Sequence, residues 1–293
     1  MRYGVIIAAA FVVLWSTGFL GGKLGLPYAG PMTFLSLRFG IVAALLAFWV
    51  WVSGARWLTR DQVRDQAAIG ALVHFVYLGG VFAGIANGVE AGVAAMIVGL
   101  QPILTALVAR QVLGERLVAV QWMGMTLGLA GVALVVTRKL DAGLGDPLGV
   151  LFCFLSLTGI AFGSILQKTR SGDTPMRSGN AVQFASGALC CLAVAVLFET
   201  MRIDWTPDFV FALVWLIVVL SLGAVAILYW LIQRGAASEV ASLFFLVPPC
   251  TAVFAYFLFG EVLEPLEIGG MAITAVGVLL VNRPDIVARR GGG

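Results

Sequence analysis

Charged residues are scarce in this sequence of 293 residues. They make up 11% of the chain, whereas 61% of the residues are hydrophobic and the mean hydropathy is +1.02. Soluble domains usually contain about 25% charged and about 45 to 50% apolar residues. A soluble fold of this length would expose apolar patches far larger than monomers tolerate. The composition therefore excludes an ordinary soluble domain and predicts an integral membrane protein surrounded by lipid.

Motifs for metal binding and catalysis are also missing. The sequence has no C-x-x-C spacing, no H-E-x-x-H, no nucleophilic serine motif and no paired aspartates within an apolar run. The net charge is only +3, and the basic residues form no stripe or patch that would favour nucleic acid. We therefore expect neither an enzyme nor a nucleic-acid-binding protein, and no metal or other cofactor.

Acidic residues are absent from the middle of every apolar run, because all fifteen lie between the runs or at their ends. Carriers driven by protons or sodium usually keep a carboxylate near the middle of the bilayer. The sequence therefore predicts either facilitated diffusion or weak coupling through His74, its single histidine. Phosphorylated substrates are disfavoured for lack of basic partners, and an amphipathic neutral solute fits better.

Long apolar runs fill the rest of the chain. A hydrocarbon core of about 30 Å needs about 20 apolar residues per helix. Cutting the sequence at its charged residues predicts an all-α integral membrane protein with ten transmembrane helices. These cover residues 4–22, 31–52, 67–86, 92–113, 118–137, 147–167, 179–199, 209–232, 239–259 and 265–282.

The basic residues predict the orientation of these helices. If the N-terminus is cytoplasmic, most of them fall in inner segments, including Arg56, Arg60 and Arg64. The outer loops then hold only Lys23, Arg138, Lys139 and Arg202. Cytoplasmic loops are normally enriched in Lys and Arg, so both termini are expected in the cytoplasm.

The sequence is internally duplicated. A shift of 146 residues places Gly114-Glu115 on Gly260-Glu261 and Pro102 on Pro248, and a shift of 145 places Gly18 on Gly163. The predicted halves, 1–140 and 141–293, contain five spans each, and an odd number forces the second half into the membrane upside down. Inverted halves can alternate between two shapes around a central cavity, which favours a carrier over a channel.

These repeated features resemble a known family. Trp15-Ser16, Leu37-Arg38-Phe39, Gln101-Pro102 before Gly114-Glu115, and Gly260-Glu261 are similar to the EamA repeat of the drug/metabolite transporter superfamily, over essentially the whole chain. Within it, the sequence resembles the YddG-type exporters of aromatic and other neutral amino acids. The resemblance implies a multi-pass protein of the bacterial inner membrane that exports such solutes.

Polar residues inside the bilayer are the first candidates for a substrate site, because they are costly there unless they serve a purpose. His74 lies in the third span with Tyr77 three residues further on, on the same helix face. His74 is predicted either to bind a substrate carboxylate or act as a protonation switch, or to be a histidine bonded between packed helices.

Matching prolines in the fourth and ninth spans are further candidates. Gln101-Pro102 and Pro248 are predicted to interrupt their helices and leave polar groups available to a solute, although a simple packing kink is the alternative. Ser242, Phe244 and Phe245 lie near the second of these sites.

Hydroxyl and aromatic residues complete the predicted site. Trp15, Ser16 and Thr17 lie midway through the first span, although such hydroxyls can also bond their own helix. Tyr229 and Trp230 are predicted to form an aromatic wall, with the interfacial aromatic belt as the alternative.

Two further features are predicted to be structural. Arg38, whose repeat partner is Gln183, is expected to anchor its helix by extending its charge toward the membrane surface. A glycine face at Gly124, Gly128 and Gly131 recurs at Gly270, Thr274 and Gly277. Such faces suit close helix packing within a monomer or contact in a homodimer.

The sequence as a whole predicts an exporter of small neutral organic solutes, with aromatic and other neutral amino acids as the implied substrates. Two alternatives stay open. The first is that the protein exports another metabolite or a drug. The second is that it is a membrane scaffold or lipid-handling protein without a solute path.

Overall fold

The computed structural model describes residues 2–113, 118–141, 146–224, 227, 243–261 and 264–282. These residues are almost entirely helical, and the one β-bridge among them joins Ala29 to Ile203. Eight helices are long and apolar enough to cross a membrane, and two shorter apolar helices, Val247–Phe259 and Pro265–Val281, follow them. The prediction of a ten-helix, all-α membrane protein is confirmed.

The first five spans begin with α1 (Arg2–Gly25), which runs into the short turn η1 (Leu26–Tyr28). The third span is continuous from α3 through a π-helical segment, η2, into α4, and the fourth consists of two short helices. The bounds are α2 Pro31–Val52, α3 Arg60–Gly70, η2 Ala71–Gly79, α4 Gly80–Ala86, α5 Ala91–Val98, α6 Gln101–Leu113 and α7 Ala119–Asp141.

The second five spans repeat this pattern. The eighth span again contains a π-helical segment, η3, and in the described part of the ninth span a short 3-10 turn, η4, precedes the α-helix. The bounds are α8 Pro147–Arg170, α9 Met176–Phe198, α10 Pro207–Val214, η3 Trp215–Ala224, η4 Phe244–Leu246, α13 Val247–Phe259 and α14 Pro265–Asn282.

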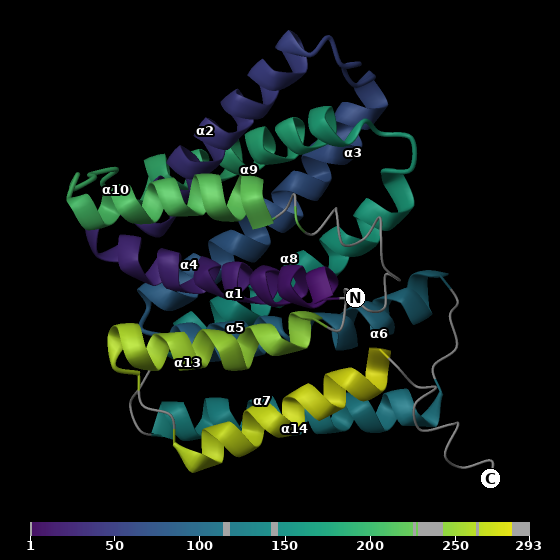
Figure 1. Cartoon of the computed structure of the whole chain (residues 1–293), viewed down its shortest axis with the longest axis vertical. Coiled ribbons are helices and arrows are strands. Elements are labelled where there is room, and N and C mark those ends of the chain that lie inside the picture. The colour runs from purple at the N-terminus through teal and green to yellow at the C-terminus, as the bar shows by residue number, and fades with distance from the viewer. Residues whose placement is uncertain are drawn as a thin grey trace.

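Equivalent helices of the two repeats pack against each other. Helix α2 packs on α9 near one end of the long axis of the molecule, and α7 packs on α14 at the other end (Figure 1). The remaining spans lie between these two pairs, with α1, α4 and α8 near the middle. The two inverted repeats therefore interleave, and each contributes helices to both sides of the centre.

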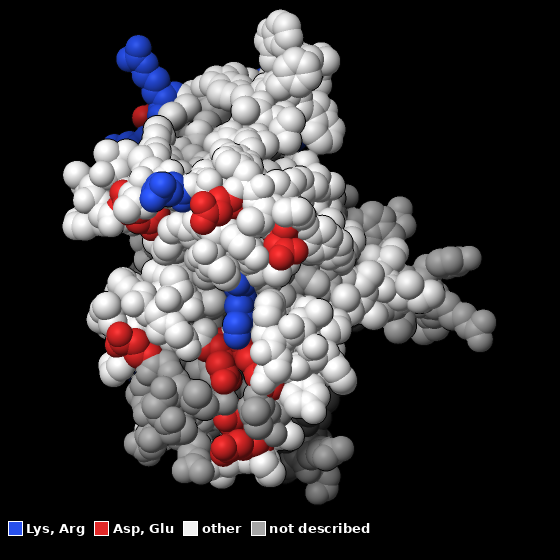
Figure 2. All heavy atoms as spheres, turned by 90° about the vertical axis from the view of Figure 1, so that its left-hand side faces the viewer, with Lys and Arg blue, Asp and Glu red and all other residues white. Residues whose placement is uncertain are grey.

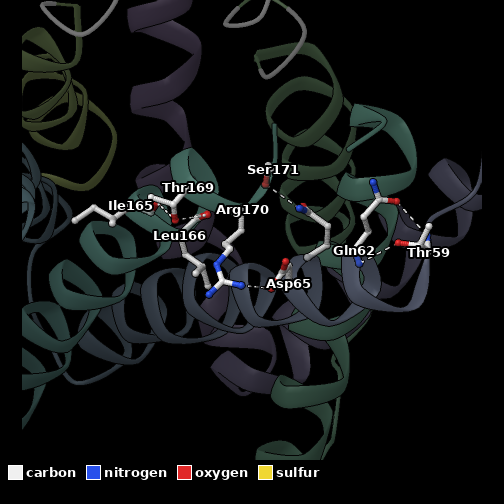
Figure 3. Close-up of polar contacts among 9 residues, drawn as sticks. Thr59, Gln62, Asp65, Ile165, Leu166, Thr169, Arg170 and Ser171 are labelled. Carbon is white, nitrogen blue, oxygen red and sulfur yellow. Dashed lines mark hydrogen bonds and ion pairs between the residues drawn. The ribbon is translucent and has the colours of Figure 1, made fainter. Parts of the chain in front are cut away.

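Local sequence signals explain where the helices start. Pro31, Pro147 and Pro207 each occupy a first helical position, where the missing N–H costs nothing. The side chains of Thr59 and Gln62 form a reciprocal capping box at the start of α3 (Figure 3). These caps satisfy backbone groups that would otherwise be left without partners at the helix ends.

The predicted break in the fourth span is present, and in the ninth span the helix changes type before the matching proline. Helix α5 ends at Val98 and α6 begins at Gln101, directly before Pro102. In the second repeat, η4 gives way to α13 at Val247, directly before Pro248. Proline cannot donate the backbone hydrogen bond that would continue the helix, so the fourth span is interrupted before Pro102 and the ninth has a 3-10 turn before Pro248.

The repeated glycine face joins α7 to α14 within one chain. A side chain added at Gly131 would meet backbone and side-chain atoms of Gly270 and Thr274, and one added at Gly277 would meet the backbones of Gly124 and Gly128. Small residues allow this approach, which in lipid replaces the hydrophobic effect as the source of helix association. The face therefore serves close packing, as one of the two predicted alternatives states.

We predict that Gly277→Ala lowers the melting temperature of the purified protein, because the added methyl group would contact backbone atoms that cannot move aside. Overpacking of this kind costs about 1 to 3 kcal/mol. Gly269→Ala on the same helix is the matched control, since its added methyl group meets nothing within 4 Å. Equal melting temperatures for the two variants would contradict the proposed role of this contact.

A cavity between the two repeats as the candidate functional site

A cavity of about 270 Å³ lies between the first three spans of each repeat. From the first repeat it is lined by α1, α2 and the third span, including Trp15, Arg38, His74 and Tyr77. The second repeat contributes α8, α9 and η3. Its polar lining residues are Ser164, Gln167, Asn180, Gln183 and Ser221.

The internal duplication extends to the cavity wall. An offset of 145 residues relates four lining positions of the first repeat to four lining positions of the second. The pairs are Trp15 with Ile160, Gly18 with Gly163, Phe19 with Ser164, and Arg38 with Gln183. Equivalent positions of the two repeats therefore line the same cavity. A site shared by both halves in this way is what a carrier needs if its halves move around the bound solute.

The two π-helical segments occupy equivalent positions and both reach the cavity. Residues 71–79 of η2 and 216–224 of η3 are related by the same offset of 145. Segment η2 supplies His74 and Tyr77, and η3 supplies Leu220 and Ser221. In a π-helical turn the backbone hydrogen bonds join residues that are five positions apart, so the helix is wider than an α-helix. Such turns frequently occur at functional sites. No proline or other sequence signal in either segment predicts them.

His74 is held by aromatic contacts. Its ring stacks on Phe184 at 4.1 Å between centroids and is tilted against Phe39 at 5.1 Å. A side chain added at Gly187 would contact the Cβ atom of His74, so the glycine allows α9 to approach η2 closely. Among the described residues, the buried Nδ1 atom of His74 has no hydrogen-bond partner. The ring is thus fixed by packing against the cavity wall.

Arg38 corrects a prediction. Its side chain was expected to extend to the membrane surface, but it is only 2% exposed and lines the cavity. Its Nη2 atom donates a hydrogen bond to Oγ of Ser221 at 3.0 Å, and its guanidinium lies 5.4 Å from the ring centre of Phe39. The sequence of α2 is apolar all round, so it does not reveal that the face carrying Arg38 is turned inward.

Amide side chains link the cavity to the surface of the molecule where α8 ends. Gln183 Nε2 donates to Gln66 Oε1 at 2.6 Å and to Gln167 Oε1 at 2.9 Å. Gln66 in turn donates to Ser171 Oγ at 2.8 Å, beside the Arg170 to Asp65 ion pair (Figure 3). The prediction missed these residues, although the position of Gln183 opposite Arg38 in the repeat was a signal for it.

The other predicted residues of the first repeat surround the cavity at different distances. Trp15 lines it, whereas Ser16 donates to the backbone of Val12 at 2.8 Å and of Val247 at 3.3 Å. Thr17 donates to its own helix at Leu14 and accepts a hydrogen bond from the indole of Trp215. The two hydroxyls thus join neighbouring helices behind the wall.

Gln101 reaches the wall indirectly, because its Nε2 atom donates to Oγ of Ser164 at 2.9 Å. Pro102 is not among the lining residues, and Pro248 lies near Gly99 at the break in the other repeat. Phe244 packs edge-on against Trp15 at 5.2 Å and so supports the wall from behind.

Four predicted site residues cannot be placed relative to the cavity. Tyr229, Trp230 and Ser242 lie outside the described residues, as does the side chain of Phe245.

The end of the molecule at which α1 finishes is held together by charged groups from both repeats. Lys23 forms an ion pair with Glu261, whose Oε1 also accepts from the backbone N–H of Ala91 at 3.0 Å. Glu199 accepts from the backbone N–H groups of Met32 and Thr33, both at 2.8 Å. Figure 2 shows this face, where acidic side chains gather around a central basic one.

These observations agree with comparisons to known proteins. The EamA-like transporter family matches residues 2–137 and again 147–283. The chain is 27% identical to the uncharacterized transporter YvbV of Bacillus subtilis, over 94% of this chain and 90% of that one. It is 22% identical to the inner membrane transporter YedA of Escherichia coli K12, over 93% and 88% of the two chains.

A third relative is a probable amino-acid metabolite efflux pump of Escherichia coli K12, 24% identical over 94% of this chain and 93% of that one. A solved crystal structure superposes with a TM-score of 0.66 and 19% identity over 100% of both chains, which supports the fold. The protein belongs to the EamA-like transporter family and is a multi-pass membrane transporter.

The cavity predicts a pattern of chemical accessibility. In a variant whose native cysteines are replaced by alanine, Ser164→Cys should react with a charged thiol reagent added from the end where α8 finishes. Thr126→Cys is the control, since Thr126 is exposed on the surface of α7 and should face lipid. Failure of Ser164→Cys to react from either side would contradict a water-accessible cavity.

Proposed function

We propose that the protein exports small neutral organic solutes, with aromatic and other neutral amino acids as substrates, by alternating access between its halves 1–140 and 141–293. The observation that carries this proposal is the cavity. It is lined by equivalent positions of the inverted repeats, and its wall combines aromatic rings with amide and hydroxyl groups. Binding sites for amphipathic solutes have this composition. The relative described as an amino-acid metabolite efflux pump supports the same substrate class.

The two ends of the cavity differ in a way that supports alternating access. Among the described lining residues only Gln167 is exposed, and it lies near the end of α8. At the opposite end Phe19 and Phe82 are buried, and the contacts of Glu261 and Glu199 tie the repeats together. This difference between the two ends supports the assignment of the structure to one of two alternating shapes.

The charge distribution supports an orientation with both termini in the cytoplasm of a bacterial inner membrane. The end near Gln167 carries the basic residues Arg56, Arg60, Arg64, Lys168, Arg170 and Arg177, together with the acidic residues Asp61, Asp65 and Asp173. The opposite end carries Glu90, Glu199, Asp204, Asp208 and Glu261, with Lys23, Arg202 and, in the last turn of α7, Arg138 and Lys139 as its basic residues in the described part of the chain. Because basic loops stay in the cytoplasm, we assign the open end of the cavity to that side.

The absence of acidic residues from the described cavity wall supports facilitated diffusion. A proton-driven carrier needs a group that binds and releases a proton while the site changes sides. Within the described wall His74 is the group suited to that role, so any coupling to protons would be weak and would use its imidazole.

Counterflow of labelled amino acids in proteoliposomes tests the function directly. We expect uptake of labelled phenylalanine or tryptophan into vesicles loaded with the unlabelled amino acid. His74→Ala should lower this flux severalfold, because it removes the ring that stacks on Phe184. Val218→Ala, on the exposed face of η3, is the control.

No counterflow with any neutral amino acid would contradict the substrate class and favour another metabolite, a drug or a scaffold. Unchanged flux and pH dependence in His74→Ala would contradict the role of the imidazole. Strong accumulation against a gradient would contradict facilitated diffusion.

Lys23→Met tests the closed end. The substitution removes one side of the ion pair, while Glu261 keeps its backbone contacts at the start of α5. A partly exposed pair contributes roughly 1 kcal/mol, so the outward-open population should rise about fivefold. The measurement is the labelling rate of Val81→Cys from the outer side, with Arg202→Met as the control. A rate that stays at the wild-type value would show that the pair does not hold this end closed.

A further inference from the structure

We propose that Arg38 is the carboxylate-binding group of the cavity, and that the protein therefore transports solutes with a free carboxylate and rejects organic cations. The inference rests on the proposed transport function and deepens it by naming the chemical group that the site requires. It goes beyond a general preference for neutral solutes, because it separates acids from amides and amines that carry the same side chain.

The hydrogen-bonding state of Arg38 is the first observation. The guanidinium offers five N–H groups, and the structure gives it one hydrogen bond, from Nη2 to Ser221. Among the described residues, its buried Nε and Nη1 atoms have no partner. Buried charges in proteins are normally paired, because burial without a partner is costly. A guanidinium with unbonded N–H groups beside a cavity is therefore suited to a ligand that brings its own anionic hydrogen-bond acceptor.

The charges around Arg38 are the second observation. No acidic side chain is among the described residues that line the cavity, so Arg38 is the wall's one charged group within that set. An anionic group entering the cavity would be attracted, and a cation would be repelled in a medium that screens charge weakly. Arginine also matches the planar, two-oxygen geometry of a carboxylate better than lysine does.

The walls near Arg38 supply the rest of a binding site. The ring of Phe39 lies against the guanidinium, and Phe39 also contacts the stacked rings of His74 and Phe184. Phe39 is fully buried, whereas His74 and Phe184 line the cavity, so a carboxylate at Arg38 would place an attached apolar or aromatic side chain next to their stacked rings. The 270 Å³ of the cavity suit a solute of amino-acid size.

Four compounds with the same aromatic ring test the inference. Phenylalanine and 3-phenylpropionate carry a carboxylate, whereas phenylalaninamide and phenethylamine do not. We expect the first two to bind the purified, full-length protein and to raise its melting temperature, and the amide and the amine to bind at least about tenfold more weakly, the factor typical of one lost charged contact. The comparison of phenylalanine with 3-phenylpropionate shows whether the carboxylate suffices without the ammonium group.

Arg38→Gln separates a binding role from a structural one. It should weaken binding of both acids at least about tenfold, while the ligand-free protein melts at the same or a higher temperature because an unpaired buried charge is removed. Arg38→Lys should retain part of the affinity. Arg202→Gln, the same change at an exposed position, should alter neither property.

Several results would overturn the inference. Binding of the amide or the amine as tightly as the acids would do so, as would full acid affinity in Arg38→Gln or a lower ligand-free melting temperature with unchanged affinity. If none of the four compounds binds, the carboxylate site is refuted. Counterflow of a solute without a carboxylate would then leave the transport function standing, whereas no counterflow of any solute would refute that function itself.

Discussion

The lack of hydrogen-bonding partners in hydrocarbon is the constraint on which this structure depends. In lipid every backbone group must be satisfied within the protein, so the chain forms helices, and small residues allow the closest approach between them. Gly277 against Gly128 joins α7 to α14, and Gly187 against His74 joins α9 to η2. The same constraint makes each buried polar side chain costly, which is why those that line the cavity are informative.

The parts of the fold that composition controls could be predicted from the sequence. Helix α2 was predicted with the bounds 31–52 that the structure shows, because charged or glycine-containing segments flank an uninterrupted apolar run. The break near Pro102 was also predicted, because proline acts locally through its missing N–H. Signals of this kind do not depend on which helix lies next to which.

The candidate site was predicted only in part, because its members are brought together by packing. His74, Tyr77 and Trp15 were identified from their polarity or size within apolar runs, and all three line the cavity. Arg38 was placed wrongly, since the direction of its side chain depends on the neighbours of α2. The widened turns η2 and η3 arise from ordinary apolar sequence, so periodicity alone does not reveal them.

The carboxylates of Glu199 and Glu261 both come from the second repeat, and both accept hydrogen bonds from the first turns of helices in the first repeat. Both residues lie just past the ends of their own helices, α9 and α13, and Glu261 is only 7% exposed while these contacts are made. When such contacts separate, water can immediately solvate the released N–H groups and carboxylates, so little desolvation penalty accumulates. Contacts of this kind hold the two repeats together, and they can be broken and formed again at a small cost in free energy.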